Sequence, residues 1–318
     1  MIIEKRNEHD VRRNFESASR IAMLVLALLA GTFAFSSIGL AQDVDPDKPD
    51  LTGVTILTHK INDSMYMLEA TRDTAGNIGV LVGDDGILIV DDQFAELTPQ
   101  IEMALEEIGP GKLQYILNTH HHADHSDGNA LLSANSDALI VAHDQTRFRL
   151  LAKDPANWPD ITFGENLSIY FGAEHVRLIA IPGGHTDNDV IVLFESMNVV
   201  HLGDLMNAGI SSFPLADLDA GGNALTILDN VTQLLNLVPD GATIIPGHGP
   251  LTDKNELYRL HEMLSDTIAV VTGKKRRGLS LEEIQAAGFS DKYAAWGQGY
   301  TSAEDWIAMI YDSIGAED

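Results

Sequence analysis

The chain of 318 residues contains no cysteine. This absence excludes a disulfide framework, a thiolate metal site, a cysteine nucleophile and a lipoprotein anchor. Basic residues are also scarce, with 20 Lys and Arg against 47 Asp and Glu and a formal net charge of −27. An acidic surface repels nucleic acid and anionic lipid, so we expect neither as a partner. Because cysteine is absent, any metal that the chain binds must be held by histidine and carboxylate.

One long apolar run stands near the N-terminus, at residues 21–40, after a basic segment and before small residues that end at Ala41. This pattern predicts a signal peptide at residues 1–41 with cleavage after Ala41. The mature protein is then periplasmic or secreted, with no stable membrane association. Two alternatives stay open: the run is just long enough for an uncleaved anchor, and Arg12-Arg13 indicates the twin-arginine export route instead of the general one.

The mature chain divides into a short tether and one domain. Residues 42–52 are rich in Pro and Asp, and we expect a disordered tether there. Residues 53–318 alternate strand and helix patterns, show no internal repeat and predict a single α/β domain. The predicted strands are residues 54–58, 65–69, 77–82, 86–90, 113–117, 138–142, 167–171, 176–181, 189–194, 198–202 and 242–245. The predicted helices are residues 98–108, 128–133, 144–152, 224–238, 253–271, 280–287 and 303–314, and residues 154–163 are predicted to be a loop.

The predicted strand at 113–117 leads into a cluster of residue types that bind metals, His120-x-His122-x-Asp124-His125. Residues two apart beyond a strand end project to the same side, so His120 and His122 can meet at one cation while His121 points away. Asp124 and His125 lie one turn further on and can reach a second cation. Imidazole nitrogen and carboxylate oxygen are ligands that zinc accepts. The alternative is a polar loop whose histidines cap the next helix.

Three further strand ends carry a residue of this kind, each beside glycine: His185, Asp204 and His248. Glycine lets the backbone turn sharply where a strand leaves a sheet. Any one of these residues alone is equally well explained by a hydrogen bond to a turn, but four such strand ends in a cysteine-free chain favour a metal site. The other histidines lack this setting and are predicted to be surface or core residues, although His143 and His201 are worth testing for closeness to the site.

The order and spacing of these residues resemble those of the metallo-β-lactamase-fold hydrolases, over nearly all of residues 53–318. The resemblance implies a four-layer αββα sandwich with two zinc ions per chain at one edge of the two sheets. It also implies which residues bind them: the first ion by His120, His122 and His185, the second by Asp124, His125 and His248, and both by a bridging Asp204.

The position of Asp204 narrows the resemblance. True β-lactamases carry cysteine or serine there, so the chain is more similar to the branch that contains glyoxalase II and the lactonases. The basic run 274–277 is not placed to hold glutathione and is interpreted as the solvated end of a helix. An apolar wall beside Asp204 is predicted from Met206, Ile210, Phe213, Pro214 and Leu215.

The resemblance implies an exported, dinuclear zinc-dependent hydrolase in which a metal-bridging hydroxide attacks a small ester, lactone, thioester or lactam. Asp124 would orient the hydroxide and accept its proton, and is the predicted catalytic residue. Asp91 is either a hydrogen-bond partner of a ligand histidine or a turn former. The alternatives are a β-lactamase proper, a mononuclear iron enzyme similar to the persulfide dioxygenases, and a non-catalytic metal-binding protein. The iron enzyme does not need His125 and His248, and their presence counts against it.

Overall fold

The computed structural model describes residues 49–209 and 212–315. The predicted signal peptide and most of the predicted tether lie outside the described residues. From Pro49 onward the chain forms one compact unit. At its start, the carbonyl oxygens of Asp50 and Thr52 accept hydrogen bonds from the guanidinium of Arg72. Within the described ranges, no helix combines the length and the apolar character that crossing a membrane requires.

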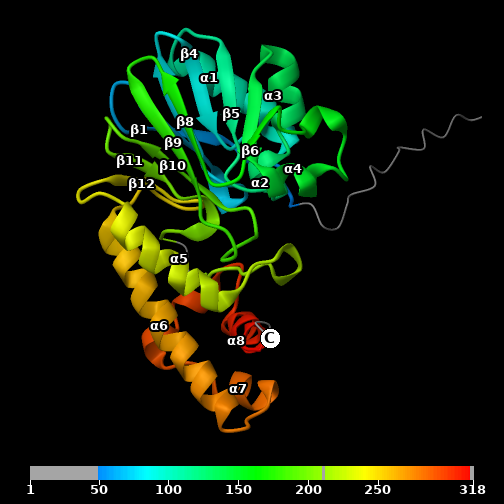
Figure 1. Ribbon diagram of the computed structural model, residues 1–318, viewed down its shortest axis with the longest axis vertical. Helices are drawn as coiled ribbons and strands as arrows, with labels where there is room; N and C mark the ends of the chain where they lie inside the picture. Colours follow the sequence, from blue (N-terminus) through cyan, green and yellow to red (C-terminus); the bar gives the residue numbers. More distant parts are fainter. Residues whose placement is uncertain (1–48, 210–211, 316–318) are drawn as a thin grey trace, which may run out of the picture. The chain divides into compact units, whose positions relative to one another are not determined.

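Two sheets form the centre of this unit (Figure 1). The first has seven strands in sequence order, antiparallel from β1 to β4 and parallel from β4 to β7. Its strands are β1 (Ile56–Lys60), β2 (Met65–Ala70), β3 (Ile78–Gly83), β4 (Gly86–Val90), β5 (Leu113–Leu117), β6 (Leu139–His143) and β7 (Ile161–Phe163). The second has five strands in the order β12-β11-β10-β9-β8, antiparallel except for the pair β11 and β12. Its strands are β8 (Asn166–Phe171), β9 (Glu174–Ala180), β10 (Val190–Phe194), β11 (Val199–His201) and β12 (Thr243–Ile245).

The sheets face each other through a shared apolar layer. Alternate residues of a strand point to opposite faces, so Met67 of β2 and Val192 of β10 enter this layer. Their neighbours Leu68 and Ile191 point outward and pack against helices. Both faces of these strands are therefore buried, which explains their nearly continuous apolar sequences.

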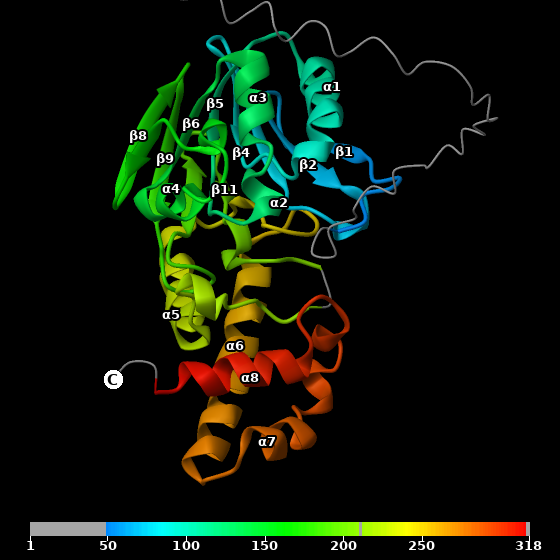
Figure 2. The ribbon, with the colours of Figure 1, turned by 90° about the vertical axis from the view of Figure 1, so that its right-hand side faces the viewer.

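Helices cover the two outer faces and complete the four-layer αββα sandwich that the resemblance implies. α1 and α3 cover the first sheet, α5 and α6 cover the second, and α8 packs against α5, α6 and α7 (Figure 2). Asn223 and Asp253 begin α5 and α6 by accepting hydrogen bonds from backbone N–H groups of the first turn, and Ser280 and Ser302 begin α7 and α8 with capping boxes. The helices are α1 (Thr98–Ile108), α2 (Ala123–Ser126), α3 (Asn129–Ser136), α4 (Asp144–Leu150), α5 (Ala224–Leu237), α6 (Lys254–Arg276), α7 (Leu281–Ala287) and α8 (Ala303–Ser313).

Two local predictions were wrong. Part of the predicted loop 154–163 is strand β7, which pairs with β6 and gains its hydrogen bonds only from that neighbour. Helix α6 continues to Arg276, beyond the predicted end at Val271. The ammonium of Lys275 donates hydrogen bonds to the carbonyls of Tyr311 and Ile314, so contacts with the end of α8 stabilise the extra turn.

The predicted metal-binding residues leave the sheets at one common edge. The N–H of Val190 donates to the carbonyl of Thr119 at 2.8 Å, which joins the start of β10 to the end of β5. In the second sheet, the N–H of Leu202 donates to Ile245 at 3.0 Å and that of Gly247 to Gly203 at 2.8 Å. These bonds bring together four loops that are distant in the sequence.

Candidate metal centre

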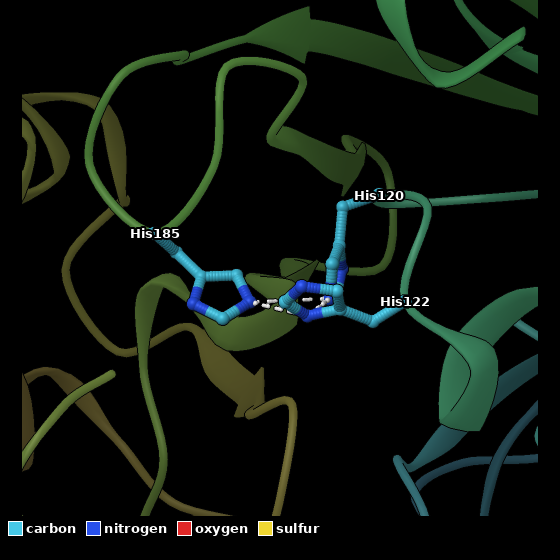
Figure 3. A group of neighbouring side chains, drawn as sticks. All are labelled: His120, His122 and His185. Atoms are coloured by element: carbon cyan, nitrogen blue, oxygen red, sulfur yellow. Dashed lines mark hydrogen bonds between the residues drawn. The ribbon is translucent and has the colours of Figure 1, made fainter. Parts of the chain in front are cut away.

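Three imidazoles converge on one point at this edge. Nε2 of His120 lies 3.1 Å from Nδ1 of His122, and Nε2 of His185 lies 3.2 Å and 3.0 Å from the same two atoms (Figure 3). Tetrahedral zinc with bonds of about 2.0–2.1 Å to nitrogen separates its ligand atoms by about 3.3–3.4 Å. The spacing of this first trio (His120, His122 and His185) is close to that value.

A second group lies beside the first. Oδ2 of Asp124 is 3.5 Å from Nε2 of His125 and 3.1 Å from Nε2 of His248. Asp124 and His125 belong to the single turn of α2, whereas His248 follows β12. This second trio (Asp124, His125 and His248) also offers three ligand atoms to one ion.

Asp204 stands between the two trios. Its Oδ1 lies 3.2 Å from Nε2 of His125 and 3.6 Å from Nε2 of His248, while its Oδ2 lies 3.6 Å from Nε2 of His185. Each oxygen thus faces a different trio. The structure brings together all seven residues that the sequence singled out, and their role as ligands stays a prediction.

The residues present fit a bound cation. Nε2 of His125 and Oδ1 of Asp204 are buried and contact each other at 3.2 Å, but neither makes a well-aligned hydrogen bond, an arrangement that is costly unless another group satisfies both atoms. Glycines leave the surrounding space open: a Cβ at Gly247 would lie 2.0 Å from Oδ1 of Asp204, and one at Gly76 would lie 2.2 Å from Cε1 of His125. A cation at this point would satisfy both orphaned atoms.

The charge states of His120, His185 and Asp124 suit a metal as well. Burial lowers the pKa of His120 well below its usual range and that of His185 to about 4, which keeps both imidazoles neutral. Burial works against ionisation of Asp124, but the nearby imidazoles of His125 and His248 outweigh it and lower the pKa of Asp124 to about 2. Neutral imidazoles and ionised carboxylates are the forms that bind metals. At His125 burial works to lower the pKa, but the carboxylates of Asp204, Asp124 and Asp91 outweigh it and raise the pKa of that imidazole well above its usual range.

Asp91 contacts the second trio directly and the first trio through the hydroxyl of Thr119. Its Oδ2 accepts a hydrogen bond from Nδ1 of His125 at 2.7 Å and another from the hydroxyl of Thr119 at 2.8 Å. The same hydroxyl lies 3.0 Å from Nδ1 of His120. Of the two roles that the sequence left open for Asp91, the structure shows the contact with a histidine. Asp91 has φ 65°, so the chain also turns sharply at this residue.

The sequence missed two groups that contact the first trio. Oδ2 of Asp217 lies 2.9 Å from Nε2 of His122, and the carbonyl of Leu215 accepts a hydrogen bond from Nδ1 of His185 at 2.8 Å. The hydrogen bond from His122 is the main cause that lowers the pKa of Asp217 to about 2. Asp217 stands in a loop two residues before another aspartate, Asp219, so no local pattern distinguishes it.

The remaining histidines of the described ranges lie outside both trios. Nδ1 of His121 is 3.1 Å from the amide nitrogen of Asn188. His201 is fully buried near the site, but its Nδ1 accepts from the N–H of Gly203 and its Nε2 lies 3.1 Å from a carbonyl oxygen. His143 caps α4. Partners elsewhere occupy the others, which are His59, His175 and His261.

The predicted apolar wall beside Asp204 was wrong in part, and its residue Ile210 lies outside the described residues. Met206 and Phe213 are buried in the core of the second sheet and the C-terminal helices, where the ring of Phe213 packs against Trp306. The basic run is held more firmly than predicted, because Lys274 donates to the carbonyl of Gly288 and Lys275 to carbonyls at the end of α8.

Comparisons with known proteins agree with this fold. The family model of the Metallo-beta-lactamase superfamily matches residues 71–248. Hydroxyacylglutathione hydrolase of Brucella anthropi is 28% identical over 188 residues, which cover 58% of this chain and 65% of that protein. The enzyme of the same name from Gloeobacter violaceus is 35% identical over 136 residues, 40% of this chain and 50% of that protein. The chain thus spans between half and just under two thirds of the length of these two relatives.

Solved structures share the fold. A metallo-beta-lactamase from Pontibacter korlensis superposes with a TM-score of 0.57 at 17% identity, covering 66% of this chain and 99% of the other. The DIM-1 metallo-beta-lactamase gives the same TM-score at 18% identity, covering 67% and 99%. At these identities the likeness concerns the fold alone.

Proposed function

The chain belongs to the metallo-beta-lactamase superfamily, and on this premise we propose that it is an exported, dinuclear zinc-dependent hydrolase of small molecules. Membership and the named relatives support metal-dependent hydrolysis. The observation that carries the proposal further is the position of Asp204, whose two oxygens face two separate trios of donors. If only one ion were bound, one of the two trios would have no ion to bind.

We assign the first ion to the first trio, the second ion to the second trio, and Asp204 to both. A carboxylate between two dications offsets part of their mutual repulsion and fixes their separation. The donors are nitrogen and oxygen only, a set that suits zinc. The completeness of the second trio counts against a mononuclear iron enzyme, as the sequence already indicated.

When bound, the two ions supply Lewis acidity and an acidified water as nucleophile. Asp124 lies at the second trio with Oδ2 directed at His248, and we propose that its carboxylate orients the attacking water and accepts the proton released on attack. Asp91 keeps Nδ1 of His125 protonated, which leaves Nε2 of that ring as the donor atom. The attack requires no serine or cysteine, and the chain has no cysteine.

We propose an ester, lactone, thioester or lactam as the substrate. The relatives named hydroxyacylglutathione hydrolases make an acyl-glutathione the first compound to test. In the described residues Lys274 and Lys275 are already bound to backbone carbonyls, which argues against their holding a glutathione carboxylate. Asp204, in place of the cysteine or serine of true β-lactamases, argues for slow turnover of β-lactams.

The test is elemental analysis of the purified mature protein, followed by a panel of lactones, thioesters, β-lactams and phosphodiesters with the zinc-loaded form. We expect close to two zinc ions per chain and turnover of at least one acyl compound. One iron per chain with oxygen consumption on a persulfide would contradict the proposal. Two bound ions without turnover of any compound would favour a non-catalytic metal-binding protein.

A further inference from the structure

The loop from Leu215 to Gly222 contacts two imidazoles of the first trio, at the ring nitrogens that point away from the other members of the trio. Nδ1 of His185 donates to the carbonyl of Leu215, and Nε2 of His122 faces Oδ2 of Asp217. The side chains of His122 and Asp217 are only 22% and 27% exposed. The contact between them is therefore partly shielded from water.

A neutral imidazole carries one proton, and only its other nitrogen can bind a metal. For His122 the nitrogen that faces the first trio is Nδ1, so the proton must stand on Nε2. An ionised carboxylate only accepts hydrogen bonds, and it stabilises that arrangement. We propose that Asp217 is a positioning residue that holds His122 in the tautomer competent to bind the first ion. This proposal rests on the assignment of the first trio as metal ligands.

The backbone fixes the carboxylate of Asp217 in place. Its Oδ1 accepts from the N–H of Ala220 at 3.0 Å, which leaves Oδ2 for His122. Its own N–H donates to the carbonyl of His185 at 2.9 Å, and its carbonyl accepts from Gly222 at 2.7 Å. A Cβ at residue 222 would lie 2.2 Å from the carbonyl oxygen of His185, so the turn requires glycine there. The loop thus ties the orientation of His122 to that of His185.

A different interpretation would place a third cation among His121, His122 and Asp217, whose donor atoms are also close together. Nε2 of His122 cannot donate to Asp217 and bind an ion at once. Nδ1 of His121 already contacts the amide of Asn188. The hydrogen-bond pattern therefore favours the positioning role over a third ion.

The test compares Asp217→Asn with Asp217→Ala. Asparagine keeps an oxygen for the N–H of Ala220 but places its NH₂ group opposite Nε2 of His122. The ring then favours a proton on Nδ1, which is the nitrogen that has to bind the metal. Alanine removes the acceptor but admits water, which permits either tautomer. Zinc affinity is measured on the metal-free proteins by competition with a chromophoric chelator, and the absorption spectrum of the Co²⁺ form reports the geometry of the first site.

We expect Asp217→Asn to weaken binding of one of the two ions by about 10–100-fold and to alter the Co²⁺ spectrum, and Asp217→Ala to have the smaller effect. The matched control is Asp187→Asn, which removes the same charge from a carboxylate that binds Arg149 and contacts no imidazole of either trio. Its zinc affinity should stay within about twofold of the wild type, since the charge is partly exposed.

If Asp217 served only to cap the turn at Ala220, alanine would be the more damaging substitution and asparagine nearly neutral, and that order would overturn the proposal. A third zinc in the wild type that is absent from both variants would assign Asp217 to a cation site instead. A wild-type protein that binds no metal would overturn the proposed function, and the positioning role with it.

Discussion

Nδ1 of His125 lies 2.7 Å from Oδ2 of Asp91, and neither side chain is exposed to solvent. With the proton between them on Nδ1, Nε2 of His125 is the ring nitrogen that can bind a metal. This atom lies 3.2 Å from Oδ1 of Asp204. Asp91 comes directly after β4, whereas Asp204 follows β11 in the other sheet. The pair therefore joins the metal centre to the frame of the sandwich.

Asp91→Asn should weaken binding of the second zinc ion by about 10–100-fold. The amide presents an N–H group to Nδ1 of His125 and so favours the tautomer that is protonated on Nε2, the nitrogen that faces the metal. Chelator competition measures the loss. The matched control is Asp92→Asn: burial raises the pKa of Asp92 well above its usual range, so the amide resembles the protonated acid already present. Equal losses of zinc in the two variants would contradict a specific role for Asp91.

Asp204→Ala should lower turnover at least about a hundredfold under saturating zinc, the scale expected when a positioned electrostatic group is lost. Both trios keep their own donors, so both ions can still bind, the second more weakly. Activity is measured together with zinc content and the melting temperature. A variant with two zinc ions and near wild-type turnover would show that Asp204 does not bridge them, and a β-lactamase-like site would then be the better interpretation.

Removal of zinc with a chelator should lower the melting temperature. Each ion at a concentration of 100 times its Kd stabilises the fold by about 2.7 kcal/mol, which corresponds to about 5–10 °C for a domain of this size. Readdition of zinc should restore both the melting temperature and the activity. An unchanged melting temperature on chelation would indicate that the buried donors hold no ion.

Gly247→Ala should lower turnover by about a hundredfold, because the added Cβ would lie 2.0 Å from Oδ1 of Asp204 and must displace that carboxylate. The control is Gly273→Ala in α6, where the nearest atom to the new Cβ is 3.9 Å away. That change should leave activity intact and stabilise the helix by up to about 1 kcal/mol. Kinetics and thermal melting of both variants decide the matter.

Export is tested by mass spectrometry of protein recovered from the periplasm of a Gram-negative host. Cleavage after Ala41 should give an N-terminus at Gln42. Recovery of the full-length chain in the membrane fraction would show that residues 21–40 act as an anchor.

The seven candidate ligands could be singled out from the sequence because each one lies in a segment that follows a strand end, and strands are visible as apolar runs. The resemblance then supplied the αββα architecture, which the structure and the family match confirm. Strand β7 and the last turn of α6 could not be predicted, since their hydrogen bonds come from distant neighbours.

The sequence by itself determined which residue types could hold a metal and in what order along the chain they occur. Only the tertiary structure decided which side chains contact the ring nitrogens of these histidines that point away from the metal site. Asp217 is 95 residues from His122 and Asp91 is 34 residues from His125, and neither separation carries a periodic signal. The contacts proposed to set the tautomers of His122 and His125 therefore arise only when the two sheets and their edge loops have packed together.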